Sequence, residues 1–234
     1  MKKLLIASTS TVHGSEYLDY ILPTLVDHFK DVKTVLFIPY ARPGGISYDK
    51  YTAVAKSAFS KINMDVKGLH EYQKAKEAIQ NAEAIFTGGG NTFELVNQLY
   101  KNDVLIDLKQ VLNNGTPYLG TSAGSNICGV TMMNTNDMPI VYPPSFDTLG
   151  MIPFNINAHY LDPIEGSTHM GETRETRIKE YHVFNETAVL GLREGSWLEV
   201  HNESIVLRGK LSARVFKQNE VPTELESGSE VVLE

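Results

Sequence analysis

The sequence lacks several features that would mark a secreted or membrane-bound protein. Its 234 residues include a single cysteine, Cys128, so no disulfide can form within the chain. It has no run of about 18 apolar residues, the length that a membrane-spanning helix needs. A chain of this size can bury enough apolar surface to fold without a disulfide or a structural metal. These absences favour a cytoplasmic protein with no membrane partner.

Clustered positive charge is also missing. The chain carries 21 lysines and arginines against 28 acidic residues, a net charge of −7, and the basic residues are scattered. Binding of nucleic acid requires grouped Lys and Arg side chains, so a small molecule or a peptide is the expected ligand.

No histidines stand at H-E-x-x-H or another tight ligand spacing. We therefore expect no metal and no cofactor. A monomer and a homodimer both stay open.

Short apolar runs alternate with amphipathic stretches over the first two-thirds of the chain. The expected strands are Leu4–Ala7, Val35–Ile38, Val66–Leu69, Ala84–Phe86 and Tyr118–Gly120. The expected helices are Glu16–Phe29, Tyr48–Ile62, Lys74–Asn81, Thr92–Tyr100 and Val104–Asn113. Uninterrupted apolar strands are typical of a parallel sheet covered by helices on both faces. The pattern predicts an α/β fold with functional residues at the carboxyl ends of its strands.

The pattern changes after Met132. A long segment rich in Pro and Asn, Asn134–Pro153, predicts a loop with a function. A helix is expected at Arg174–Tyr181, followed by short strands at Val189–Leu192, Trp197–Val200, Ser204–Leu207, Arg214–Phe216 and Val231–Leu233. A hairpin pattern at Val200–Ser204 favours an antiparallel extension of the same sheet. We therefore expect one domain over residues 1–234.

The strongest motif is Gly120-Thr121-Ser122-Ala123-Gly124, which follows an expected strand. It matches the G-x-S-x-G turn that projects a nucleophilic serine above the sheet. The Ala123 N–H, at the start of the next helix, could then stabilise an oxyanion. The alternative is a strand-to-helix turn of small residues without chemistry.

A run of three glycines, Gly88 to Gly90, lies between another strand and helix. Glycines let the backbone approach a ligand, and the helix start offers N–H groups to an anion. One interpretation is a phosphate cradle, although the run is neither G-x-G-x-x-G nor a P-loop. The other is that the Gly90 N–H forms the second half of an oxyanion hole, which we favour.

A serine nucleophile needs a base and an orienting carboxylate. Of the seven histidines, His159 is the candidate because it ends an alternating apolar stretch that approaches the sheet. A buried histidine without a catalytic role is the alternative. Order along the chain suggests Asp137 as the carboxylate, and Glu194, which follows a strand, is its rival.

These residues together resemble the peptidase E family of α-aspartyl dipeptidases. The resemblance covers nearly the whole chain in the family's order. It is carried by Gly88–Phe93, Ser122–Gly124, Thr135–Val141, Ile156–His159 and Gly171–Arg174.

The resemblance implies a triad of Ser122, His159 and Glu194, which reverses the preference for Asp137. It makes Asp137 an essential residue that either positions His159 or meets the substrate's α-ammonium. It places the oxyanion hole at the Gly90 and Ala123 N–H groups, with Gly89 beside them in the substrate-binding loop. The implied fold is a three-layer α/β/α sandwich like those of flavodoxin and the class I glutamine amidotransferases. Those amidotransferases carry cysteine at the nucleophile position, so a glutaminase is disfavoured.

The resemblance also assigns Arg174 to the side-chain carboxylate of an N-terminal aspartate, since a guanidinium can hold a carboxylate with two parallel hydrogen bonds. A solvated helix-surface arginine is the alternative. The expected function is a serine exopeptidase that cleaves Asp-Xaa dipeptides. An isoaspartyl or cyanophycinase-like peptidase and a non-catalytic anion-binding module are the other hypotheses. The loop Tyr160–Met170, if it borders the pocket, bears on how strictly aspartate is selected.

Overall fold

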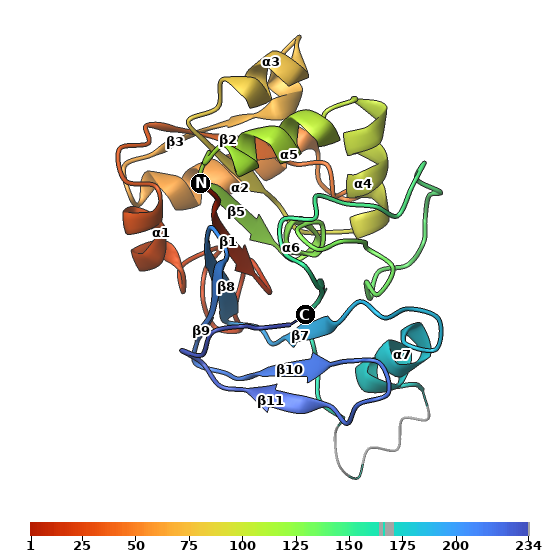
Figure 1. The fold of residues 1–234 in the computed structure, drawn as a ribbon. Helices are drawn as coiled ribbons and strands as arrows, with labels where there is room; N and C mark the ends of the chain where they lie inside the picture. Colours follow the sequence, from red (N-terminus) through yellow and green to blue (C-terminus); the bar gives the residue numbers. More distant parts are fainter. Residues whose placement is uncertain (164–165, 167–170, 234) are drawn as a thin grey trace.

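The computed structural model describes residues 1–163, 166 and 171–233 (Figure 1). The strands are β1 (Lys3–Ala7), β2 (Thr34–Ile38), β3 (Asp65–Gly68), β4 (Ala84–Thr87), β5 (Tyr118–Thr121), β6 (Asn155–Ala158), β7 (Val189–Leu192), β8 (Ser196–His201), β9 (Ser204–Gly209), β10 (Ala213–Phe216) and β11 (Thr223–Leu225). The helices are α1 (Leu22–His28), α2 (Tyr48–Ser60), α3 (Ala75–Gln80), α4 (Thr92–Lys101), α5 (Leu105–Asn113), α6 (Ala123–Asn126) and α7 (Arg174–Tyr181), with a 3₁₀ turn at Leu69–Glu71.

The main sheet has seven strands in the order β3-β2-β4-β5-β1-β8-β9. The first five are parallel, and β8 and β9 are antiparallel, joined by the predicted hairpin. The mostly parallel sheet is therefore confirmed. Because β4 and β5 are neighbours, the glycine run and the Ser122 turn leave the sheet side by side.

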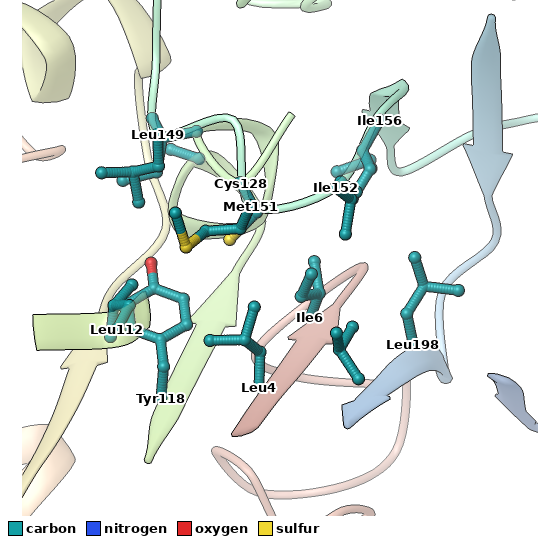
Figure 2. Close-up of a cluster of buried hydrophobic side chains, with 14 of the residues drawn as sticks. Leu4, Ile6, Leu112, Tyr118, Cys128, Leu149, Met151, Ile152, Ile156 and Leu198 are labelled. Carbon is teal, nitrogen blue, oxygen red and sulfur yellow. The ribbon is translucent and has the colours of Figure 1, made fainter. Parts of the chain in front are cut away.

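Helices cover both faces of the main sheet, as its uninterrupted apolar strands require. Alternate residues of β1 point to opposite sides: Leu4 and Ile6 join the core under α3, α4 and α5, whereas Leu5 and Ala7 join the core under α1 and α2. Figure 2 shows the first of these cores, in which Leu4, Ile6 and Tyr118 meet side chains that follow α6 and side chains from β6 and β8.

A second sheet, in the order β11-β10-β7-β6, lies beside the main one (Figure 1). In it β6 and β7 are parallel and the other pairs antiparallel. The single extended sheet that we predicted is therefore right for β8 and β9 and wrong for β7 and β10. The chain reverses at Gly195, whose φ is 85°, so that β8 leaves β7 and pairs with β1.

One predicted helix start, one missed strand and one predicted strand stand out as errors. The first helix begins at Leu22 rather than Glu16, since Leu18 has a φ of 64° that interrupts a helix, and Pro23 then occupies the first turn. The strand β11 was not predicted. Val231–Leu233 is not a strand, because only a single bridge, from Glu230 to Val206, reaches β9 there. No helix in the described residues is long and apolar enough to span a membrane.

Candidate active site

Ser122 occupies the turn between β5 and α6 in a strained backbone conformation. Its φ and ψ are 53° and −112°, a combination that is uncommon for any residue with a side chain. Its N–H donates to Ala7 O on the neighbouring strand at 3.1 Å. The turn requires glycine at 124, where a Cβ atom would lie 2.2 Å from Thr87 O. The tight turn predicted from the motif is therefore present. It places the serine hydroxyl at the carboxyl end of the central strand β5.

Ser122, His159 and Glu194 form a continuous hydrogen-bonded chain. His159 Nδ1 lies 2.7 Å from Glu194 Oε1, and His159 Nε2 lies 2.9 Å from Ser122 Oγ. Since an ionised carboxylate only accepts, Nδ1 carries the proton and Nε2 accepts from the serine hydroxyl. This is the arrangement of a nucleophile, a general base and an orienting carboxylate. The histidine and glutamate come from the second sheet, where the ends of β6 and β7 lie together.

Ser8, which sequence reasoning missed, joins both catalytic loops to the main sheet. It is fully buried directly after β1. Its hydroxyl donates to Leu192 O at 2.7 Å and accepts from the His159 N–H at 2.9 Å. Leu192 lies two residues before Glu194, so the Ser8 side chain fixes the backbone beside both His159 and Glu194. Its place at the carboxyl end of a parallel strand was the available signal.

We expect Ser8→Ala to lower kcat by about 10- to 100-fold, because loss of the shared hydroxyl lets the two loops shift relative to Ser122. KM should change by less than about threefold, since Ser8 is too deeply buried to touch a substrate. Steady-state kinetics that give kcat and KM separately check this.

Ser196→Ala is the matched control. Ser196 is also fully buried, and its hydroxyl donates to Leu211 O at 3.1 Å; among the described residues no hydrogen bond joins that side chain to Ser122, His159 or Glu194. Both variants should lose some thermal stability, and only Ser8→Ala should lose kcat. Equal kinetics in the two would show that Ser8 merely supports the fold.

The glycine loop presses against the nucleophile. A Cβ atom at Gly89 would lie 2.8 Å from Ser122 Cβ, so only glycine lets the loop come this close. In the described part of the chain, the backbone N–H groups of Gly89, Gly90 and Ala123 have no hydrogen-bond acceptor. Free N–H groups beside a serine nucleophile suit a tetrahedral oxyanion.

Asp137 occupies the N-terminus of α4, immediately after the glycine loop. Its Oδ2 accepts from Thr92 N at 2.7 Å, Thr92 Oγ at 2.5 Å and Thr135 Oγ at 3.0 Å. The helix start therefore already holds a carboxylate, which disfavours the phosphate-cradle interpretation. No hydrogen bond joins Asp137 to His159 among the described residues. The side chain that sequence order suggested as the triad carboxylate instead caps a helix, and Glu194 meets the histidine.

The loop that carries Asp137 is attached to β6 by asparagines. Asn134 Nδ2 donates to Ile156 O at 3.0 Å, and Asn136 Nδ2 donates to Ala158 O at 2.9 Å. Asn157 Nδ2 returns a bond to Asn134 O at 2.8 Å. The Asn-rich segment is thus a positioned loop, and it sets Asp137 at the N-terminus of α4.

Arg174 opens α7 and is partly buried. Burial lowers the pKa of its guanidinium, Arg177 adds to that shift, and Asp137 is close enough to oppose it. None of its N–H groups donates to another described residue. Most of the loop Tyr160–Met170, which would bear on aspartate selection if it bordered the pocket, lies outside the described residues. Among those that are described, no group of three His, Cys, Asp or Glu side chains could hold a metal ion.

Comparison with known proteins gives concordant results. Residues 4–208 match the sequence profile of peptidase family S51. Peptidase E of Streptomyces coelicolor is 45% identical over 97% of this chain and 93% of its own length. A probable α-aspartyl dipeptidase of Drosophila melanogaster is 45% identical over 96% of this chain and 93% of its own.

Solved structures share the fold. A peptidase from an acI-B1 actinobacterium superimposes with a TM-score of 0.74 at 14% identity, covering 99% of this chain and 96% of that one. A Listeria monocytogenes protein provisionally assigned to peptidase E gives a TM-score of 0.69 at 19% identity, covering 89% and 98%. With a serine turn, a base and a carboxylate in hydrogen-bond contact, and relatives this similar over nearly its full length, the chain belongs to peptidase family S51.

Proposed function

We propose that this protein is a serine-type α-aspartyl dipeptidase that hydrolyses Asp-Xaa dipeptides through an acyl-enzyme on Ser122. The observation that carries the proposal is the chain of hydrogen bonds from Glu194 through His159 to Ser122, beside the free N–H groups of Gly90 and Ala123. A non-catalytic binding module would have no need of this arrangement. The name of the Drosophila relative, a probable α-aspartyl dipeptidase, supplies the substrate class.

The reaction begins with attack of Ser122 Oγ on the carbonyl carbon of the N-terminal aspartyl residue. His159 Nε2 takes the hydroxyl proton as the new C–O bond forms, and Glu194 stabilises the resulting imidazolium. The carbonyl oxygen becomes an oxyanion that accepts from the Gly90 and Ala123 N–H groups. Because these groups are backbone atoms held by strand ends, they need no rearrangement as charge develops.

The second half returns the enzyme to its starting state. His159 gives the proton to the departing amine, and the C–N bond breaks to leave aspartyl-Ser122. Water then loses a proton to His159 and attacks the ester carbonyl. His159 returns that proton to Ser122 Oγ as the bond between the serine oxygen and the carbonyl carbon breaks, and free aspartate is released. No step calls for a metal or a cofactor.

Two groups on the α4 side would recognise the aspartyl residue. Asp137 uses Oδ2 for the helix cap and has Oδ1 left over among the described contacts, which suits an α-ammonium. Arg174 is desolvated and lies near Asp137, and its guanidinium suits the side-chain carboxylate. A requirement for both charges would make the enzyme an exopeptidase specific for aspartate.

We expect the wild type to hydrolyse Asp-Leu and to leave β-Asp-Leu, Asn-Leu and N-acetyl-Asp-Leu nearly uncut. Arg174→Gln should lower kcat/KM for Asp-Leu by about 100- to 1,000-fold, since the bound carboxylate loses its charged partner, with much less effect on Asn-Leu. Release of free amino acid, followed by chromatography, measures all four reactions.

Arg177→Gln, three residues further along α7, is the matched control, because Arg177 pairs with Glu172 at 3.7 Å on the helix surface. Its ratio of Asp-Leu to Asn-Leu activity should stay that of the wild type. Cleavage of β-Asp-Leu in preference to Asp-Leu would instead make this an isoaspartyl peptidase. No cleavage of any peptide would rule out the proposed function.

We further propose that residues 1–234 act as one cytoplasmic peptidase domain, with the three-layer arrangement of flavodoxin and the class I glutamine amidotransferases. Helices on both faces of the main sheet support that architecture. A monomer and a homodimer are both compatible with a cleft built from a single chain.

A further inference from the structure

Arg42 lies at the edge of the active site and has no part in the mechanism above. It follows β2, the strand beside the one that leads into the glycine loop. Its Nε donates to Gly89 O at 3.4 Å, and its guanidinium carbon lies 4.9 Å from the centre of the Tyr51 ring. Tyr51 donates to the same Gly89 carbonyl, at 3.1 Å. The arginine is therefore placed by two contacts.

These contacts put the guanidinium close to the reacting atoms. Gly89 packs against Ser122, at a distance that leaves no room for a Cβ atom between them. Tyr17 lies beside Tyr51 in the same place, and although burial raises the pKa of Tyr17, Arg42 is near enough to oppose that shift. Arg42 is therefore linked to the nucleophile through a single residue, Gly89, which it bonds and which packs on Ser122.

The Arg42 guanidinium has donors to spare. Its side chain is exposed, and in the described part of the chain it forms no ion pair and donates only from Nε. The two terminal NH₂ groups therefore have no acceptor among the described residues and can bind a ligand. A planar fork of N–H donors next to an enzyme nucleophile matches a carboxylate of the substrate.

Arg42 and the Asp137 cap of α4 lie on opposite faces of the main sheet. Arg174 is near Asp137, which caps α4 on one face of the sheet. Arg42 rests on Tyr51 of α2, which covers the other face. An Asp-Xaa dipeptide also has carboxylates on both sides of its scissile bond: the aspartyl side chain precedes the bond, and the C-terminus follows it.

We infer that Arg42 binds the C-terminal carboxylate of the leaving residue and so makes the enzyme prefer dipeptides to longer or C-terminally blocked peptides. This inference rests on the proposed function. It adds the C-terminal carboxylate to the substrate groups that the site recognises. In it Arg42 is a specificity-determining residue, since it contacts the leaving residue rather than the reacting atoms.

The test compares Asp-Leu with Asp-Leu-amide, which lacks only the C-terminal charge. In the wild type, kcat/KM for Asp-Leu should exceed that for the amide by about 10- to 100-fold, as expected for a charge-assisted hydrogen bond. Arg42→Gln should lower kcat/KM for Asp-Leu by that factor and leave the amide unchanged, so that the ratio approaches one. Arg42→Lys, which keeps the charge, should retain part of the preference.

Arg208→Gln is the control, because Arg208 pairs with Glu199 at 2.8 Å on the edge of the sheet and lies away from the cleft. In Arg208→Gln the ratio of kcat/KM for Asp-Leu to kcat/KM for Asp-Leu-amide should equal that of the wild type. An equal loss on both peptides in Arg42→Gln would mean that Arg42 only supports the glycine loop, and would overturn the inference. So would an unchanged ratio, or a loss confined to the preference for Asp-Leu over Asn-Leu. If the wild type cut neither peptide, the proposed function would fall and the inference with it.

Discussion

Ser122→Ala should lower kcat for Asp-Leu by about 10⁴- to 10⁶-fold while leaving the protein folded. The serine oxygen is the only described side-chain atom that His159 Nε2 contacts, at 2.9 Å, and alanine removes the nucleophile together with its activating hydrogen bond. Removing a triad nucleophile elsewhere costs on the order of 10⁶ in kcat. Discontinuous assays over hours, with thermal melts for folding, give the measurement.

A covalent probe makes this prediction sharper. A fluorophosphonate should label the wild type with one adduct per chain, placed on Ser122 by peptide mass mapping, and should leave Ser122→Ala unlabelled. Ser125→Ala is the control, since Ser125 is a buried serine three residues away that donates to Ala7 O at 2.6 Å and does not touch His159. More than about 1% residual activity in Ser122→Ala would exclude the acyl-enzyme.

Asp137→Asn should lower kcat/KM for Asp-Leu by about 100-fold or more. An asparagine can keep one oxygen directed at Thr92 and Thr135, so the helix cap survives and only the negative charge is lost. If that charge binds the substrate's α-ammonium, its removal weakens a charge-assisted hydrogen bond. The control substrate is succinyl-leucine, which lacks the amino group and should be affected by less than about threefold.

Thr135→Val separates the charge from the hydrogen-bond network. It removes the 3.0 Å bond to Asp137 Oδ2 without changing any charge, and it should cost less than about tenfold on either substrate. An equal loss on both substrates in Asp137→Asn would contradict the ammonium role. It would favour an indirect effect on His159, through Asn126 and the Ala158 N–H.

The main sheet could be predicted from the sequence because its strands are buried on both faces. Leu4–Ala7 and Val35–Ile38 are uninterrupted apolar runs, and in the structure every one of these residues is buried. The second sheet could not be predicted. Short strands such as Val189–Leu192 carry no local signal for which sheet they join, since that depends on which edge a distant strand leaves open.

The candidate site divides in the same way. Ser122 and the glycine run can be recognised in the sequence, because a strained turn and a close backbone approach allow only small residues nearby. His159 and Glu194 could be identified through the resemblance, and the structure brings them together. Ser8 and Arg42 escaped notice, because a lone serine or arginine has no local pattern. Ser8 acts on a residue 151 positions away, through a contact that only the folded chain creates.

Ser122 follows a strand of the main sheet, whereas His159 and Glu194 follow strands of the second sheet, and this division affects the order in which the site forms during synthesis. The nucleophile emerges first during synthesis, then the base, and the acid last. The strand β1 also waits for β8 before its second edge is paired. Folding must therefore close contacts between the two ends of the chain, which is a slow class of event. Until these contacts form, Ser122 lacks the hydrogen bond to His159 that activates it. The arrangement that activates Ser122 is therefore complete only after β6 and β7 have reached the main sheet.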